Sequence, residues 1–148
     1  PFDGFWMQKA YRIPDNDCAC TEPGKAADKT VPINRFTVRS FLTNLTDGGQ
    51  VKAGHTPLRG IAFDGGSGIK AVAVSTDDGK TWTEARLGQD LGPYAFRPWT
   101  LDVDLSPGSH AIRVRATAND GASQPMEPRW NPAGYLRNVV ETTRVRAV

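Results

Sequence analysis

The two cysteines have the most distinctive chemistry in this sequence. Cys18 and Cys20 are separated by one residue and are the only cysteines of the chain. A CxC pair can ligate a soft metal ion, but a tetrahedral zinc site needs four ligands. A c-type haem needs a CxxCH motif, which the sequence lacks. The pair is also too close in sequence for an easy mutual disulfide. We therefore predict two free loop cysteines and no metal site, with their role left open.

The histidines and the acidic residues form no recognisable catalytic set. A serine or cysteine nucleophile needs a base that a third group holds in place. His55 lies in the turn-rich run Gly54–Pro57, His110 opens a predicted strand, and neither has a motif partner. Most of the acids fall in turns or on the wet faces of strands. The glycine-rich run 65–68 is not followed by the Lys-Ser/Thr pair of a phosphate-binding loop. The sequence therefore predicts no catalytic residue.

The tryptophans supply the remaining candidate sites. Trp82 and Trp99 fall within predicted strands, where packing in the core is the expected role and stacking against a sugar is the alternative. Trp130 lies in segment 129–138, which is irregular and rich in aromatic and polar groups. Loops of that composition are where function concentrates.

Composition excludes several classes of partner. Lys and Arg number 18 against 16 Asp and Glu, which gives a net charge of +2. This balance, without a basic run, predicts no nucleic-acid partner. The longest apolar run falls far short of the ~18 residues of a membrane span. Because the chain opens at Pro1 without a signal-like segment, we expect a processed product or an expressed fragment.

The elements that must position these residues are strands. Apolar residues recur with a period of two from Arg35 onward, and turn signals separate about seven such segments. The predicted inward faces carry Phe36, Val38, Ser40 and Leu42; Trp99, Leu101, Val103 and Leu105; Ile112, Val114 and Ala116; and Val145 and Ala147. Further strands are predicted at 58–63, and at 69–76 and 81–87 around the hairpin loop Asp77–Lys80. The fold class is therefore all-β, an immunoglobulin-like antiparallel β-sandwich of about seven strands.

The first 34 residues differ from the rest. Five apolar side chains crowd the start of this segment without a helical or strand period: Phe2, Phe5, Trp6, Met7 and Tyr11. We predict an extended, irregular segment whose aromatic residues pack against another body, followed by a surface loop over 15–29. The expected division is therefore 1–34, an N-terminal remnant and linker, and 35–148, the sandwich.

Five short motifs in a fixed order resemble one known family. They are Gly60–Gly66, Val74–Trp82, Arg115–Gly121, Gln124-Pro125 and Trp130-Asn131 with Gly134. Together they resemble the C-terminal dimerisation domain of sulfite oxidase-type molybdenum oxidoreductases. The resemblance covers residues 35–148 and is specific as an ordered set, although each piece is weak alone.

The N-terminal segment extends this resemblance. Residues 6–12 look like the end of the molybdenum domain, which makes Tyr11 and Arg12 candidates for the side that faces the cofactor domain. The run Tyr11–Pro14 is similar to the bacterial sulfite dehydrogenase branch, which implies a periplasmic protein.

The resemblance implies a role in a larger enzyme. The parent would oxidise sulfite at a molybdopterin-bound molybdenum and pass electrons to a cytochrome c. This chain would pair two subunits as a homodimer, bind no cofactor itself and catalyse nothing alone, because the cysteine that ligates molybdenum belongs to the upstream domain's motif. Cys18 and Cys20 do not match that motif.

The substrate pocket departs from the family pattern. In animal and plant relatives the loop reads Trp-Asn-x-Arg-Gly, and its arginine reaches toward the bound anion; here that position is Ala133. Arg137 is the candidate replacement, because a guanidinium offers paired donors to a tetrahedral oxyanion. The alternative is an ordinary surface contact. We therefore predict a substrate pocket with Trp130, Asn131 and Arg137.

Two other functions remain open from sequence. A free-standing carbohydrate-binding module would use Trp82, Trp99 or Trp130 as its stacking surface, but it does not explain the ordered motifs. A complete metal hydrolase lacks a ligand set and ranks last. For the dimer, outward-facing aromatic residues that include Phe41 hint at the interface, and the sequence does not decide which sheet carries it.

Overall fold

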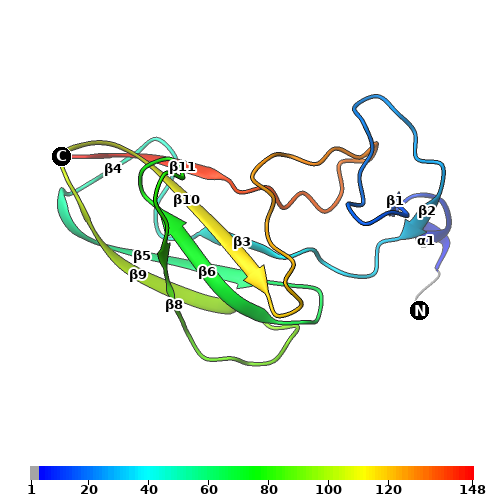
Figure 1. Cartoon of the computed structure of the whole chain (residues 1–148), viewed down its shortest axis with the longest axis horizontal. Helices are drawn as coiled ribbons and strands as arrows, with labels where there is room; N and C mark the ends of the chain where they lie inside the picture. The colour runs from blue at the N-terminus through cyan, green and yellow to red at the C-terminus, as the bar shows by residue number, and fades with distance from the viewer. Residues whose placement is uncertain (1–3) are drawn as a thin grey trace.

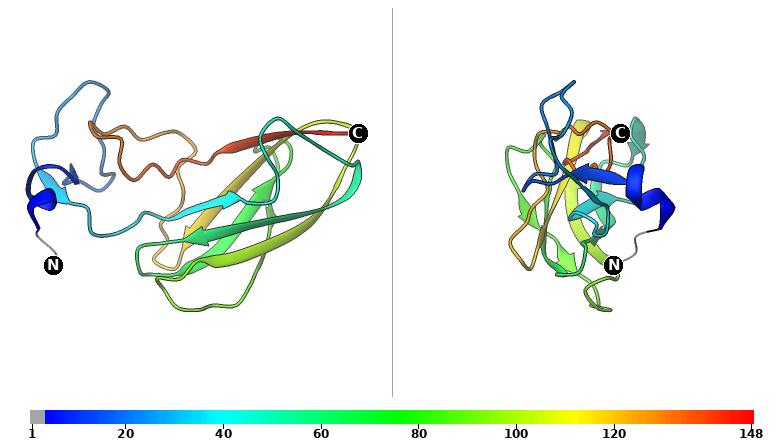
Figure 2. Two further views of the ribbon diagram at one scale, coloured as in Figure 1. Left: turned by 180° about the vertical axis from the view of Figure 1, so that it is seen from behind. Right: turned by 90° about the vertical axis from the view of Figure 1, so that its right-hand side faces the viewer.

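Strands with alternating inward and outward side chains dominate the chain and build two sheets packed face to face. The computed structural model describes residues 4–148. The sandwich occupies one end of an elongated molecule, and the N-terminal segment occupies the other, as Figure 1 shows. Figure 2 shows the same arrangement from behind, with the C-terminus at the far end of the sandwich. The predicted all-β sandwich is confirmed. No helix within the described residues is long and apolar enough to cross a membrane.

The first sheet has five strands in the order β4-β11-β10-β6-β7. Their bounds are β4 Gly49–Val51, β6 Ile69–Ser75, β7 Thr83–Glu84, β10 Gly108–Ala118 and β11 Thr142–Ala147. Strands β4 and β11 run parallel, a short exception in the otherwise antiparallel sandwich that the sequence predicts. The sequence predicts only a turn at Asp47–Gly49. It does not predict strand β4, because a strand of three residues is too short to show an alternating pattern.

The second sheet has four strands in the order β3-β5-β9-β8, all antiparallel. Their bounds are β3 Arg39–Leu42, β5 Gly54–Phe63, β8 Arg86–Leu87 and β9 Arg97–Leu105. Strand β5 pairs with β9 over nine residues, from Gly54 opposite Leu105 to Ala62 opposite Arg97. This long pairing makes β5 and β9 the centre of the sheet.

The core lies between the sheets and matches the predicted inward faces in most positions. Its largest member is Trp99, which is 1% exposed and whose indole Nε1 donates a 2.9 Å hydrogen bond to the Ser40 hydroxyl. The core cluster also contains Val38, Leu58, Val72, Val74, Leu105, Ile112, Val114, Ala116, Val145 and Ala147. Burying such side chains contributes about 1.5–3 kcal/mol for each large one, so the core is the main source of stability.

One predicted strand is split between the two sheets. The sequence predicts a single strand over 81–87, but β7 pairs with β6 in one sheet and β8 pairs with β9 in the other. Ala85, between them, is 5% exposed and donates its N–H to the carbonyl of Val72 at 2.8 Å. A small buried residue lets the chain cross the core edge here, and local alternation cannot reveal such a crossing.

Phe36 does not lie on the predicted inward face. It precedes β3, is 68% exposed, and places its ring edge-on to Phe63 with 5.9 Å between ring centroids. The alternation therefore begins at Val38, and Phe36 belongs to an aromatic cluster on the outside of the sheet.

The N-terminal segment is more regular than predicted. Phe5–Lys9 forms the short helix α1, and β1 (Arg12–Pro14) pairs with β2 (Thr30–Pro32). Arg12 joins these pieces, because its guanidinium donates to the carbonyl of Met7 at 2.9 Å and to the hydroxyl of Thr30 at 2.8 Å. Its donors are thereby used within the segment. Phe2 lies outside the described residues.

Cys18 and Cys20 form a disulfide, which corrects the prediction of two free cysteines. The physical reason is the residue between them. Ala19 has a left-handed φ of +48°, so the chain reverses and brings the two Cα atoms to 5.1 Å, within the range that a disulfide spans. The loop over 15–29 otherwise lies at the surface as predicted.

Candidate functional site

Gln124 fixes the start of the loop that carries the predicted site. Its side chain is fully buried, and its Oε1 accepts the backbone N–H groups of Ser40 at 2.9 Å and Ala116 at 3.0 Å. Its Nε2 donates to the carbonyl of Asn138 at 3.0 Å. One amide therefore joins β3, β10 and the far end of the loop, so residues 125–138 leave and return at a fixed position.

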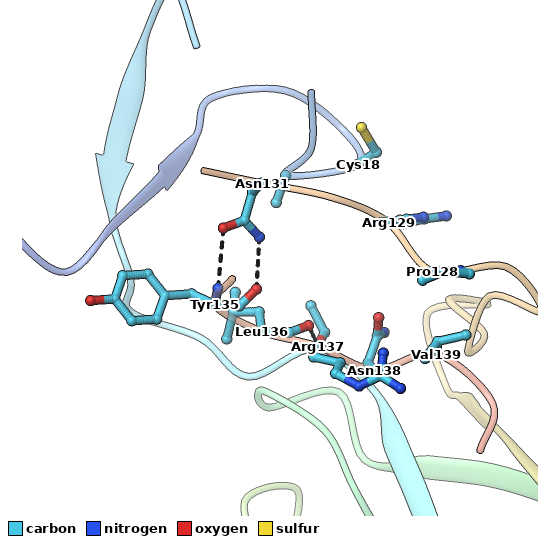
Figure 3. A pocket seen from close by; sticks show the side chains of 11 residues that line it. Cys18, Pro128, Arg129, Asn131, Tyr135, Leu136, Arg137, Asn138 and Val139 are labelled. Atoms are coloured by element: carbon cyan, nitrogen blue, oxygen red, sulfur yellow. Dashed lines mark hydrogen bonds between the residues drawn. The ribbon is translucent and has the colours of Figure 1, made fainter. Parts of the chain in front are cut away.

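Asn131 shapes the loop from inside. Its Nδ2 donates to the carbonyl of Tyr135 at 2.8 Å, and its Oδ1 accepts the N–H of the same residue at 3.1 Å, as Figure 3 shows. Asn131 is 8% exposed, so it closes a turn rather than presenting its amide to a ligand. The next residues tighten the loop, with Leu136 in the left-handed region at φ +57°.

The N-terminal segment packs against this loop. The N–H of Thr21 donates to the carbonyl of Trp130 at 2.8 Å, and the ring of Tyr11 lies 5.8 Å from that of Tyr135. Two predicted features, Tyr11 and the 129–138 loop, are therefore brought together although they are more than a hundred residues apart. The sequence contains no signal for this contact, because neither segment is periodic.

Two arginines line the hollows on either side of the loop. Arg129 and Arg137 border both the small pocket of Figure 3, beside Cys18 and Asn138, and the wider hollow beside Trp130. Within residues 4–148 the Arg129 side chain makes no hydrogen bond or ion pair. Sequence reasoning missed Arg129, although its position next to Trp130 was available as a signal.

Arg137 is only partly engaged. Its Nε lies 3.8 Å from Oε1 of Glu141, and the same oxygen accepts a 3.1 Å hydrogen bond from Arg39. The Arg137 side chain is 58% exposed, so this shared, solvated pair contributes little to stability. The two terminal nitrogens of Arg137 remain available to an anion.

Asp64 borders a neighbouring hollow but is not suited to proton transfer. Burial raises its pKa, but hydrogen bonds from the Ser67 hydroxyl at 2.6 Å, the Ser67 N–H at 2.8 Å and the Gly66 N–H at 3.2 Å outweigh that effect and lower the pKa overall. All three hydrogen bonds go to Oδ2 of the carboxylate, which thereby closes the loop after β5.

Comparison with known sequences decides the family. The profile of the Mo-co oxidoreductase dimerisation domain matches residues 30–147. The chain belongs to this family. This Mo-co dimerisation domain is 33% identical to mitochondrial sulfite oxidase of Homo sapiens over 120 residues, which cover 75% of the chain and 22% of that protein. It is 31% identical to sulfite oxidase of Arabidopsis thaliana over 146 residues, which cover 90% and 37%.

A solved structure shares the fold of the Mo-co dimerisation domain. The crystal structure of the sulfane dehydrogenase SoxCD from Paracoccus pantotrophus superimposes with a TM-score of 0.70 at 24% identity, covering 93% of this chain and 35% of that one. The chain thus spans 22%, 37% and 35% of the lengths of these three relatives. The resemblance to the dimerisation domain of sulfite oxidase-type enzymes, predicted from the sequence, is confirmed.

Trp82, Trp99 and both histidines lie elsewhere in the sandwich. Trp99 is in the core as predicted, whereas Trp82 lies in the turn before β7, half-buried, and donates to the carbonyl of Gly79 at 3.0 Å. His55 lies 3.7 Å from Asp102 on an exposed sheet face. His110 bonds the carbonyl of Ser106 at 2.8 Å. None of them joins the 129–138 loop.

Proposed function

We propose that this chain is the self-association domain of a larger molybdenum enzyme that oxidises sulfite. The observation that supports this most directly is the match of residues 30–147 to a dimerisation domain. The relatives that share more than 30% identity are named sulfite oxidases. In this proposal the parent is a homodimer, each subunit contributing one sandwich, and electrons from sulfite pass to a cytochrome c.

The molybdenum cofactor belongs to another part of the parent in this proposal. Within residues 4–148 no three His, Cys, Asp or Glu side chains are grouped so that they could hold a metal ion. Both cysteine sulfurs are joined to each other, so this chain offers no thiolate ligand. The described residues therefore do not fit the cofactor, and we assign no step of the reaction through it to them.

Residues 1–34 are proposed to be the end of the domain that precedes the sandwich. The contacts of Thr21 with Trp130 and of Tyr11 with Tyr135 support this, because they fix the N-terminal segment against the 129–138 loop. A domain that continues from this segment would lie next to Arg129 and Arg137. Phe5 and Trp6, 72% and 63% exposed, supply apolar surface for it to cover.

Arg137, assisted by Arg129, is the proposed contact of this domain with the substrate anion. Sulfite and sulfate present several oxygens to planar, paired guanidinium donors, a geometry that arginine satisfies better than lysine. Trp130 borders the same hollow. Asn131 acts indirectly, because its two hydrogen bonds to Tyr135 hold the loop on which Arg137 lies.

The test is kinetic and uses the full-length parent enzyme. Replacing Arg137 with Ala is expected to raise the KM for sulfite about tenfold or more, which corresponds to the ~1.4 kcal/mol of one charge-assisted contact. The KM of Arg137→Lys should lie between those of wild type and Arg137→Ala. Lysine keeps the positive charge but loses the paired donors of the guanidinium group. Arg144→Ala, an exposed arginine on β11, is the matched control. Equal KM values for Arg137→Ala and wild type would contradict the substrate contact.

The proposed location is the periplasm. The Cys18–Cys20 disulfide supports this, because disulfides persist in oxidising compartments and are rare in the cytosol. Thiol labelling of the parent in intact cells and after reduction would test it. Labelling of both Cys18 and Cys20 without reduction, located by peptide mass spectrometry, would contradict it.

The structure does not favour the carbohydrate-binding alternative. Sugar stacking needs an exposed aromatic face, and Trp99 is 1% exposed while Trp82 is half-buried in its turn. Trp130, at 37% exposure, is the remaining candidate of the three, and a single ring within a loop is not a platform.

A further inference from the structure

The outer side of the β3-β5-β9-β8 sheet carries a continuous aromatic surface. Phe63, at the end of β5, is its centre, with ring centroids 5.9 Å from Phe36, 6.5 Å from Phe41 and 5.3 Å from Phe96. The rings of Phe36 and Phe96 are 68% and 61% exposed. With two neighbours on β5 and β9, this phenylalanine face consists of Phe36, Phe41, Ile61, Phe63, Phe96 and Pro98. An exposed apolar cluster of this kind marks an interaction surface.

The same side of the sheet carries two adjacent columns of opposite charge. The outward residues of β5 beyond the phenylalanine face include Arg59 and His55, and those of β9 include Asp102 and Asp104. In the register of the two strands, Arg59 lies opposite Thr100 and His55 opposite Asp104. The surface is therefore mainly apolar at one end, where the Arg39 guanidinium lies 5.4 Å from the centre of the Phe41 ring. At the other end it is basic along β5 and acidic along β9.

The outer side of the other sheet has a different character. Its exposed or half-buried outward residues on β10 and β11 include four arginines, at 113, 115, 144 and 146. Arg113 forms an ion pair with Asp78 at 2.8 Å, and the other three have no such partner among residues 4–148. Two copies that met through this side would bring like charges together, which opposes association.

We propose that the phenylalanine face and the two charged columns form the interface between two copies of this chain, related by a two-fold axis that runs parallel to β5 and β9 and between them. This inference rests on the proposed function and adds the surface and the arrangement that serve it. A two-fold interface must be self-complementary. With this axis, each β5 lies across from the partner's β9.

This axis satisfies both features of the surface at once. It places the apolar end against the partner's apolar end, with Ile61 across from Pro98 of the partner subunit. It also places the basic column across from the partner's acidic column, so that Arg59 can reach Asp102 of the partner subunit. The other two-fold axis in the plane of the sheet, perpendicular to the strands, would set the phenylalanines against the charged end. Aligned packing of two sheets face to face is common in β-sandwiches.

A stable dimer requires that a second copy cover a small share of this chain's surface. A stable obligate dimer buries upward of ~2,000 Å² in total, or ~1,000 Å² from each partner. That is about a tenth of the 9358 Å² that this chain exposes.

A charge-swap experiment on the full 148-residue chain tests the arrangement. Arg59→Asp and Asp102→Arg should each raise the dimer dissociation constant at least tenfold, measured by sedimentation equilibrium, because each places like charges across the interface twice. An equimolar mixture of the two variants should regain dimers, because both pairs then become opposite charges in the mixed dimer. Phe96→Ser should weaken the dimer to a similar extent, and Arg146→Asp, on the other sheet, should leave it unchanged. Circular dichroism of each variant verifies the fold.

The outcomes separate this inference from the proposed function. If the wild type dimerises and the Arg59, Asp102 and Phe96 variants do so equally well, the interface lies elsewhere and the inference is overturned while self-association stands. If the single variants weaken the dimer and the mixture stays monomeric, the two-fold arrangement is wrong. A wild type that is monomeric at every concentration would contradict both, and would favour the preceding domain as the occupant of the phenylalanine face.

Discussion

The indole ring of Trp99 lies directly against the backbone of Gly60 on the neighbouring strand. A Cβ atom placed at Gly60 would stand 2.2 Å from Cζ2 of Trp99 and 2.3 Å from the carbonyl oxygen of Phe41. Gly60 is paired in register with both Trp99 and Leu42. The absence of a side chain at this position therefore lets β3, β5 and β9 close around the largest residue of the core.

Gly60→Ala is accordingly expected to destabilise the domain strongly. The added methyl group meets backbone as well as a packed ring, so relief requires strand movement, and overpacking of this kind costs about 1–3 kcal/mol or more. The urea concentration at the midpoint of unfolding measures this loss of stability. Gly121→Ala serves as the control, because its site is open and only its positive φ of +91° is strained. Equal midpoints for the two variants would contradict the packing argument.

Gln124→Leu should destabilise the domain by several kcal/mol. Leucine matches the size of the side chain but leaves the N–H groups of Ser40 and Ala116 and the carbonyl of Asn138 without partners, at about 1–3 kcal/mol for each buried group. Hydrogen exchange at the Ser40 and Ala116 amides should accelerate together with the loss of stability. Ser123→Ala, which removes a hydroxyl pair with Thr117, should cost less than half as much; a larger loss there would rule out a dominant role for Gln124.

Asp77 makes the stability of the β6–β7 turn dependent on pH. The N–H of Thr81 at 2.9 Å, the Thr81 hydroxyl at 2.7 Å and the Ser75 hydroxyl at 2.7 Å hold the pKa of this carboxyl far below its usual 3.8. Because the pKa is lower in the folded state, the stabilisation is complete above pH ~4 and is lost as the pH falls through the folded-state pKa.

Asp77→Asn should therefore lower the urea midpoint at pH 7, and the difference from wild type should shrink as the pH falls from 4 toward 2. Asp15→Asn, an exposed position in the loop over 15–29, is the control and should show little difference at either pH. A constant difference across this range would mean that the Asp77 carboxylate is not the cause.

Removal of the disulfide should have a local effect. A bridge with a sequence separation of 2 closes so short a loop that it restricts the unfolded chain little, so Cys18→Ser with Cys20→Ser should change the free energy of unfolding by less than about 1 kcal/mol. The turn it fixes places the Thr21 amide against Trp130. Exchange of that amide should accelerate while core amides stay protected. Global destabilisation by several kcal/mol would contradict this view.

The long strands could be predicted from sequence because their signal is local. In β10, Ile112, Val114 and Ala116 alternate with the outward Arg113 and Arg115, and the sandwich follows from several such segments. The misses share a cause. Ala85 moves the chain from one sheet to the other, and β4 pairs with β11 from nearly a hundred residues away. Neither the crossing between sheets nor the distant strand pairing produces a periodic pattern in the sequence.

The candidate site was less accessible to sequence reasoning. The family resemblance pointed to Trp130, Asn131 and Arg137, but their roles depend on the path of the loop. Only the structure shows that the Asn131 amide is hydrogen-bonded to the backbone of Tyr135 and that Arg129 borders the same hollows as Arg137. The disulfide was missed because it depends on the left-handed backbone of Ala19, which the residue type alone does not predict.

The most direct test of the account is the solution mass of the chain across a dilution series, by light scattering after gel filtration. The monomer mass is 16.1 kDa. We predict twice this mass, maintained down to low micromolar concentration, because the sandwich carries the interface. A mass of one chain at every concentration would contradict the assignment of self-association to this domain.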